Sequence, residues 1–370
     1  MSGHAPITDD SAASSGSAFA RALETLSPGY FALVMGTGIV SIGLNEVGAD
    51  LPSTVLLVIA AVSYVVLWVL YIWRAVSHRP AVLRDLRGPE MAFAYFTVVA
   101  GTDVLAVRLI DAGFIGIASA LVLFAAALWL VFGYVLPWQV FLTRDGKPIL
   151  ARVNGTWFIW AVASQSLAIG LTRIQPHLPA GQAWLGIAAV LSWSVGVALY
   201  AGVAMLVLLR IVHFPMTPEE FEPPYWVAMG AMAIAVVAGS DIVAMASTPM
   251  VDATRALISG TIAVFWSFCL WLIPMLVGAG VWRHVVHRVP WTYVPTFWSI
   301  VFPIGMFAVA SINLGKVDKL PLVEGIGTVV LVIAVIVWAI VFVAMLRRVG
   351  EVLWSPVGGA FRRSGPAGSG

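Results

Sequence analysis

Ten long runs of apolar residues restrict the fold of this chain more than any other feature of its sequence. A helix that crosses the hydrocarbon core of a bilayer needs about 20 predominantly apolar residues. Only 10% of the 370 residues are charged, whereas a soluble domain has about 25%. The sequence therefore predicts an all-α membrane protein. We expect its ten transmembrane helices at 28–45, 51–73, 91–112, 114–138, 152–172, 184–210, 225–247, 255–282, 292–313 and 322–346.

The segments outside these spans are too short for a second domain. Residues 1–26 are small and polar, so we expect a disordered cytoplasmic tail there, a transmembrane domain over 27–348, and a mostly disordered second tail over 349–370. A net charge of +2 is too small to favour nucleic-acid binding. The single cysteine, Cys269, excludes an internal disulfide and lies in an apolar run, where we interpret it as a packing residue.

Basic residues are distributed unevenly between the two sets of loops. The two tails and the connections after even-numbered spans carry 15 of the 20 Lys and Arg residues, and the other connections carry five. Cytoplasmic loops are enriched in Lys and Arg. We therefore expect a multi-pass protein of the plasma (inner) membrane with both termini in the cytoplasm, which an even number of spans also requires.

A short motif recurs along the chain. VVAGTDVLAV (Val98–Val107) and VVAGSDIVAM (Val236–Met245) are identical at six of ten positions, with weaker copies at Val34–Ile42 and Val162–Ile169. Two helices return the chain to the same side, so the copies are parallel repeats. We expect five helical hairpins around an axis, with odd helices inside and even helices facing lipid. Alternatively, the small residues of the motif serve only helix packing.

The first span, SPGYFALVMGTGIVSIGL (Ser27–Leu44), resembles the tellurite-resistance/dicarboxylate transporter family of the voltage-dependent anion channel superfamily. That family includes bacterial tellurite-resistance permeases, fungal malate and sulfite transporters, and plant slow-type anion channels. The resemblance continues through NGTWFIWAVASQSLA (Asn154–Ala168), EPPYWVAMGA (Glu222–Ala231) and FWSIVFPIGMFAVASI (Phe297–Ile312). It implies transmembrane transport of a small anion, either inorganic or a four-carbon dicarboxylate, by a protein that is not an enzyme and uses no cofactor.

The resemblance also implies an architecture and a gate. Family members form homotrimers with a separate central pore in each subunit, and a phenylalanine on the ninth helix blocks that pore. The matching residue here is Phe302, directly before Pro303. Pro303 removes a backbone donor and Gly305 follows it, so the helix can bend there and bring the ring toward the axis.

The expected pore lining is neutral and consists of small residues on the odd spans. Hydroxyls and exposed backbone can bind an anion weakly, which permits passage rather than tight capture. The expected lining residues, besides Pro303 and Gly305, are Gly36, Thr37, Gly38, Ser41, Gly101, Thr102, Ser164, Gln165, Gly239, Ser240 and Ser311.

Asp103 and Asp241 need an explanation, because a carboxylate at membrane depth is costly and usually functional. They can pair with a base: Arg108 is on the same span, poorly spaced from Asp103 but well spaced, at i, i+3, from Asp111. They can carry protons in a coupled carrier. They can also form the dyad of a membrane-embedded aspartyl protease, but its GxGD motif is missing. Channel and proton-coupled carrier both remain open.

No other motif in the sequence predicts catalysis or a metal site. His284 and His287 have a spacing of i, i+3 that could hold a metal ion, but no third ligand is nearby in the sequence. We therefore interpret this segment as a basic cytoplasmic loop and expect no bound metal.

Overall fold

The computed structural model describes residues 19–142, 148–178, 181–317 and 319–354. Within these residues the regular secondary structure is helical, and nine helices are long and apolar enough to cross a membrane. This confirms the prediction of an all-α membrane protein. A further long helix, α7 (Phe158–Ile174), has 17 residues and is not one of those nine.

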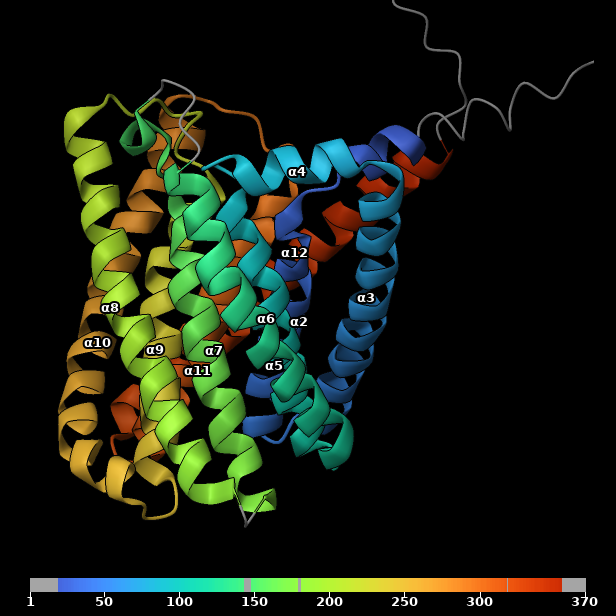
Figure 1. Ribbon diagram of the computed structural model, residues 1–370. Coiled ribbons are helices and arrows are strands. Elements are labelled where there is room, and N and C mark those ends of the chain that lie inside the picture. The colour runs from blue at the N-terminus through green and yellow to red at the C-terminus, as the bar shows by residue number, and fades with distance from the viewer. Residues whose placement is uncertain (1–18, 143–147, 179–180, 318, 355–370) are drawn as a thin grey trace, which may run out of the picture.

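Five helices form the interior of the bundle. They are α2 (Ala32–Glu46), α5 (Phe96–Asp111), α7, α9 (Val227–Ala244) and α11 (Trp298–Val317). Each contacts the next in this order, and α11 contacts α2, so the five close into a ring. All five run in the same direction, away from the end of the molecule that carries the short helix α4 (Arg79–Arg87) (Figure 1).

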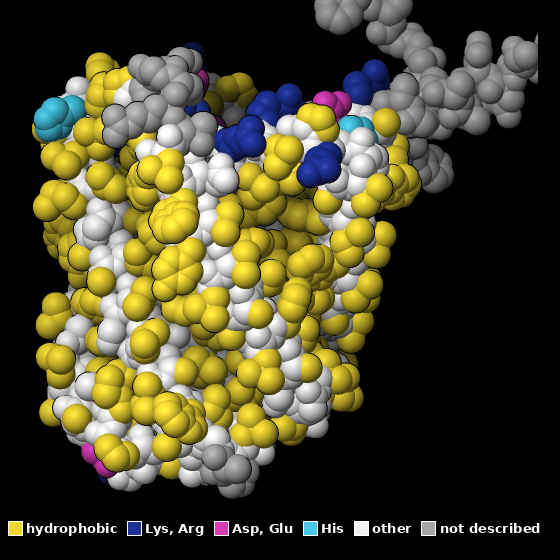
Figure 2. Space-filling model, viewed as in Figure 1, with side chains coloured by type: hydrophobic (Ala, Val, Ile, Leu, Met, Phe, Trp, Pro, Cys, Tyr) yellow, Lys and Arg dark blue, Asp and Glu magenta, His cyan; other side chains and the backbone are white. Residues whose placement is uncertain are grey.

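Five longer helices surround this ring. They are α3 (Asp50–Ser77), α6 (Ile115–Leu142), α8 (Gln182–His213), α10 (Pro249–Val281) and α12 (Pro321–Trp354), and each packs against the inner helix that precedes it. Their most apolar segments are 17–28% buried, whereas those of the inner spans measured in the same way are at least 78% buried. Figure 2 shows the consequence: hydrophobic side chains cover the flank of the molecule, and basic side chains gather at its upper edge. Such a hydrophobic lateral surface is stable in contact with the hydrocarbon core of a bilayer.

The inner helices share one kind of beginning. A 3₁₀ turn precedes each of them: η1 (Pro28–Phe31), η2 (Ala92–Tyr95), η4 (Gly155–Trp157), η7 (Pro223–Trp226) and η9 (Pro295–Phe297). Three of these turns begin with proline. Proline suits this position because the first backbone N–H groups of a helix have no acceptor within it, and proline has no N–H. Side chains cap two of the turns, because Ser27 accepts from the Gly29 N–H and Asn154 from the Thr156 N–H.

Helix boundaries differ from the sequence prediction in several places. α10 begins at Pro249 rather than at 255, since proline is favourable in a first helical turn and Asp252 complements the helix dipole there. α12 continues to Trp354, past the expected boundary at 348. Residues 19–24 are helical within the expected disordered tail, and Phe19 packs on Trp73 with ring centroids 5.4 Å apart. Residues 1–18 and 355–370 of the two tails lie outside the described residues.

Candidate functional site

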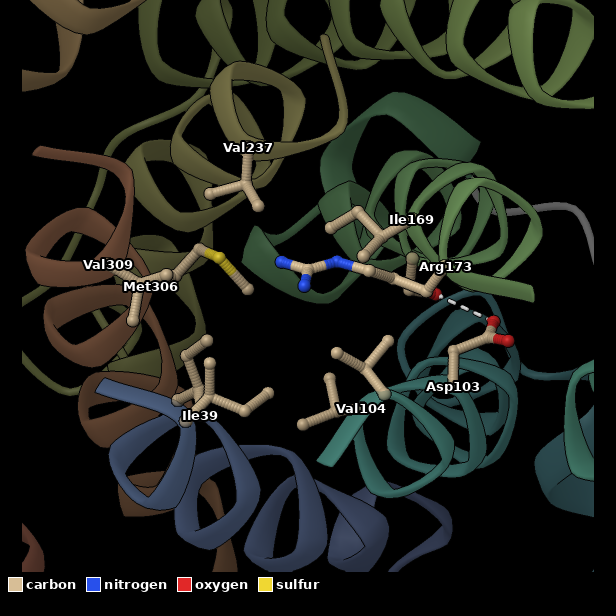
Figure 3. Close-up of a pocket in the computed structure, with 11 residues that line it drawn as sticks. Ile39, Asp103, Val104, Ile169, Arg173, Val237, Met306 and Val309 are labelled. Carbon is tan, nitrogen blue, oxygen red and sulfur yellow. Dashed lines mark hydrogen bonds between the residues drawn. The ribbon is translucent and has the colours of Figure 1, made fainter. Parts of the chain in front are cut away.

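An apolar cavity lies on the axis of the inner ring. Every inner helix contributes a side chain to it, namely Ile39, Val104, Ile169, Val237 and Met306 (Figure 3). The cavity volume is about 20 Å³, which is room for about one water molecule. At this level the side chains therefore close the axis, and the surface that closes it is mostly hydrophobic; Asp103, Ser166 and Arg173 are its polar lining residues.

Phe302 lies on the same face of α11 as the cavity-lining Met306. The two residues are four positions apart, which places them on one helix face one turn apart. Phe302 is nearer the α4 end and is only 1% exposed. Pro303, beside it, packs against α9, where a Cβ on Gly230 would come within 2.8 Å of the proline ring. Phe302 therefore lies one helical turn from Met306 of the axial constriction, on the side of the α4 end.

A larger cavity opens at the other end of the ring, away from α4. We call it the outer vestibule; it has a volume of about 550 Å³ and lies between the ends of α7, α9 and α11. Its lining includes Thr172, Gln175, Ser240, Asp241 and Asn313. Arg173 lines both the vestibule and the axial cavity, and Figure 3 shows its guanidinium extending toward the centre of the ring. Arg173 is thus the cation between the apolar constriction and the vestibule.

Each inner helix carries at least one ionisable residue near this end, and α5 carries two, Arg108 and Asp111. We call five of these residues, one from each helix, the outer charged ring: Glu46, Asp111, Arg173, Asp241 and Lys316.

Contacts of the outer charged ring give each of its acids a basic or a polar partner. Arg173 Nε donates to Asp241 Oδ2 at 3.0 Å, and Arg173 Nη1 lies 3.9 Å from Asp111 Oδ1. Lys316 Nζ donates to the backbone carbonyl of Glu46 at 2.9 Å. The Asn313 amide, oriented to donate, lies 2.9 Å from each Glu46 carboxylate oxygen. The carboxylates therefore have partners that offset the repulsion they would exert on an anion.

Asp103 has a different environment from Asp241. It is fully buried; Oδ2 accepts a hydrogen bond from Ser166 at 3.2 Å, and Oδ1 has no partner among the described residues. Figure 3 shows its carboxyl turned away from the centre of the ring. Gly170 makes room for it, because a Cβ there would lie 2.9 Å from Oδ1.

The two copies of the recurring motif lie at different depths. Asp103 lies 11 residues after the first residue of η2, whereas Asp241 lies 18 residues after the first residue of η7. The difference of seven residues corresponds to about two helical turns, or roughly 10 Å. The sequence similarity therefore does not make these aspartates equivalent in space. Asp103 bonds to Ser166 and Asp241 bonds to Arg173, whereas the two carboxyls of an aspartyl dyad would lie against each other.

Arg108 pairs with neither of the acids that its sequence spacing suggests. It is 4% exposed and donates from Nε to the hydroxyls of Ser41 and Ser53, and from Nη2 to Ser53. Asp111 instead lies against Arg173 of α7. Arg108 therefore faces the α2–α3 hairpin and makes no hydrogen bond to Asp111 among the described residues, although its charge acts on Asp111 from a distance. Asp241 lies against a base of another helix, Arg173 of α7.

Most of the hydroxyls expected to line a pore face the outer helices instead. An aromatic residue of each outer helix bonds to the inner helix of the following hairpin. The pairs are Tyr64 with the Thr102 hydroxyl at 3.1 Å, Trp129 with Ser164 at 2.8 Å, Trp193 with the Ala235 carbonyl at 3.0 Å, Trp266 with Ser311 at 2.9 Å, and Trp338 with Thr37 at 3.0 Å. These bonds connect α12 back to α2 and close the outer layer. The pore-lining prediction for Thr37, Thr102, Ser164 and Ser311 is corrected, because an indole N–H or a phenol in the membrane needs a partner that lipid cannot supply.

Close helix packing likewise explains the predicted glycines. At each of these glycines an added Cβ would meet a side chain or backbone atom of a neighbouring helix or turn. The neighbours are Val301 and Trp298 for Gly36, Val104 for Gly38, Phe31 for Gly101, Ile262 for Gly239, and Ile39 for Gly305. Ser41 bonds to Ser53, and the Gln165 amide donates to the Trp193 carbonyl. Within the described residues, Ser240 is the one predicted hydroxyl that lines either cavity, namely the outer vestibule. The lining that sequence reasoning missed is the apolar set headed by Ile39 and Met306, together with Arg173.

Groups at the α4 end form a smaller polar cluster. Trp298 Nε1 donates to the Tyr293 phenol at 3.2 Å, and the phenols of Tyr30 and Tyr293 are 3.2 Å apart. Burial raises the pKa of Tyr293, so its phenol stays neutral. This contact joins the start of α2 to the start of α11, the helix that carries Phe302.

His284 and His287, the two histidines with the i, i+3 spacing, bond to nearby backbone carbonyls. His284 Nδ1 lies 2.8 Å from the Val289 carbonyl, and His287 Nδ1 lies 3.1 Å from the Trp282 carbonyl. No cluster of three or more His, Cys, Asp or Glu that could hold a metal ion occurs in the described part of the chain. Cys269 is buried, with its Sγ 3.6 Å from the Met229 carbonyl of α9.

The fold and the site define a multi-pass membrane protein whose inner helices surround a closed axis with a cation at one end. Comparison with known families agrees with this class. Residues 25–346 match the family model described as a voltage-dependent anion channel. The chain belongs to that family of membrane transporters and channels.

Individual relatives extend over much of the same region. A membrane protein of Mycobacterium tuberculosis, described as uncharacterized, is 50% identical over 155 residues, which are 42% of this chain and 79% of the relative. Two proteins described as uncharacterized transporters of Methanocaldococcus jannaschii are more distant but match more of the chain. One is 24% identical over 349 residues, covering 89% of this chain and 96% of the relative. The other is 23% identical over 342 residues, covering 88% and 96%.

Proposed function

We propose that this protein lets small anions cross the membrane along the axis of its inner helix ring, and that Phe302 is the gate. The observation that carries the proposal is the order of groups along that axis. Phe302 comes first, then the apolar constriction that includes Met306, then Arg173 and the outer vestibule. A narrow apolar segment closes a path by bulk and by excluding water, and a cation beyond it favours anions over cations.

The proposal includes the full architecture. Ten spans form five hairpins, with α7 as the tenth span; its position between α5 and α9 in the ring supports this count. The excess of basic residues at the α4 end supports a cytoplasmic location for that end and for both termini, in the plasma (inner) membrane. A homotrimer with one path per subunit follows from the family resemblance.

The cargo is a small inorganic anion or a four-carbon dicarboxylate. Two mechanisms fit the site: a channel, and a carrier in which Asp103 moves protons. The buried Asp103, which has no basic partner among the described residues, supports the carrier. The apolar constriction, whose aliphatic side chains offer no ligand atoms to an ion, supports the channel.

Anion flux into liposomes containing Phe302→Ala tests the gate. If the ring is a plug, flux per folded protein rises. Phe307→Ala is a matched control: Phe307 is on the same helix and equally buried, but its ring stacks on Trp266 of an outer helix at 6.1 Å. The control should lose about 3–5 kcal/mol of stability, as buried phenylalanines do, without a gain in flux.

An unchanged or reduced rate for well-folded Phe302→Ala protein would remove this residue from the gate. Repeating the assay with and without a pH gradient separates the two mechanisms. A carrier that uses Asp103 accumulates anion when the gradient is applied, whereas a channel does not.

A further inference from the structure

The outer vestibule is an unfavourable place for an anion unless a cation compensates. All five inner helices end at this end of the ring, and α7, α9 and α11 end at the vestibule itself. A helix C-terminus carries a partial negative charge of about half a unit. Three acids of the outer charged ring add to this: Glu46, Asp111 and Asp241. An anion that passes this end of the axis therefore needs specific donors.

Arg173 can supply those donors. Its Nε is bonded to Asp241 and its Nη1 lies 3.9 Å from Asp111, and no further hydrogen bond of its guanidinium occurs among the described residues. The side chain is 32% exposed and lines both cavities. Its remaining N–H groups are thus available at the base of the vestibule.

Ser240 is an independent indication of a ligand. The residue is 7% exposed and lines the vestibule, and its hydroxyl oxygen is buried without a hydrogen-bond partner among the described residues. A buried hydroxyl normally has a partner, because leaving it unpaired costs about 1–3 kcal/mol. Ser240 is adjacent in sequence to Asp241, the residue that bonds to Arg173. Lys316 lines the same vestibule as a second cation.

We propose that Arg173 and Ser240 form a binding site for a small oxyanion in the outer vestibule, and that the Asp241 carboxylate competes with this anion for Arg173. The inference rests on the proposed function, since it describes a site along the transport path at which the anion binds. Asp241 acts as a tethered competitor: it neutralises Arg173 when no anion is present and yields when an anion arrives.

The class of ligand follows from the competitor. A guanidinium presents planar donors that match a carboxylate or a similar planar oxyanion, whereas a halide cannot use this fork. Because a carboxylate of the protein already bonds to Arg173, another carboxylate or nitrate can take its place. We therefore expect nitrate and acetate to bind more tightly than chloride.

Nitrate binding to the full chain in detergent micelles tests this proposal. Nitrate replaces chloride at constant ionic strength, and tryptophan fluorescence follows the unfolding temperature, which rises when a ligand binds the folded state. Asp241→Asn should lower the half-saturating nitrate concentration about tenfold, because one charge-assisted hydrogen bond no longer competes. Asp50→Asn is the control: it removes an exposed carboxylate at the same end that lines neither cavity described here, and nitrate affinity should not change.

Two further variants complete the test. Arg173→Gln should abolish stabilisation by nitrate, and Ser240→Ala should weaken nitrate binding about fivefold, as the loss of one neutral hydrogen bond predicts. Equal nitrate affinity in wild type, Asp241→Asn and Ser240→Ala would overturn the proposal, even if Arg173→Gln does not fold. Acetate in place of nitrate should give the same order of variants. The binding assay needs no transport. A negative result in it does not contradict the proposed Phe302 gate, and a negative result in the flux assay does not contradict the proposed binding site.

Discussion

The same substitution, aspartate to asparagine, should have different effects at Asp103 and at Asp241. At Asp103, asparagine keeps an oxygen that can accept the Ser166 hydrogen bond, and there is no basic partner among the described residues to lose. We therefore expect the free energy of unfolding to change by less than about 1 kcal/mol.

At Asp241 the substitution breaks the 3.0 Å contact with Arg173. A hydrogen bond between charged groups contributes about 1.5–3 kcal/mol. Arg173 is 32% exposed, so water screens part of this interaction and can hydrate the guanidinium after the carboxylate is removed. We expect Asp241→Asn to lower the free energy of unfolding by about 1–2 kcal/mol.

The assay is equilibrium unfolding in mixed micelles, followed by the fluorescence of the 16 tryptophans. A loss of about 3 kcal/mol or more in Asp103→Asn would contradict our interpretation, because a loss of that size indicates a buried charge with a partner. Equal losses at both sites would contradict it as well, since they would mean that the shared motif rather than the local contacts sets the energetics. If Asp103 carries coupled protons, its asparagine variant also loses pH-driven uptake while downhill exchange continues.

Two further predictions concern packing and orientation. Gly155→Ala should destabilise the protein by about 3 kcal/mol or more, because its Cβ would lie 2.2 Å from the Pro224 carbonyl carbon, a backbone atom that cannot move aside. Gly133→Ala, within α6 and with open space around its Cβ, should instead be neutral or stabilise by about 0.5–1 kcal/mol; thermal unfolding of the two variants decides. A cysteine at Ser77 in a Cys269→Ser background should react with an impermeant thiol reagent only after membranes are opened, and labelling of intact cells would refute a cytoplasmic α4 end.

The recurring motif shows how far the sequence alone reaches at the site. VVAGTD and VVAGSD are nearly identical strings, and the sequence invites the inference that Asp103 and Asp241 are equivalent. Their positions depend on where each helix begins, and the beginnings differ by about two turns relative to the motif. Local similarity therefore identified two important acids but not their depth or their partners.

The sequence also does not show whether a side chain of an inner helix faces the axis or an outer helix. A small hydroxyl such as Thr37 is compatible with a pore and with a helix interface, and the sequence does not distinguish them. The deciding residue, Trp338, is 301 positions away and bonds to it from an outer helix. Conversely, the residues that close the axis, such as Ile39 and Met306, are ordinary apolar side chains that no motif marks.

The sequence by itself determined the class of fold and the approximate spans, because hydropathy and length are local properties that a bilayer imposes on each segment separately. It also favoured an interior position for the helices that carry the small residues, since small residues cluster where helices approach closely. The tertiary structure alone decided that Arg173 of α7 pairs with Asp241 of α9, 68 positions later, and that this pair lies between an apolar constriction and a vestibule. Such a pair depends on the rotation and depth of two helices relative to each other, which only the packing of the whole ring fixes.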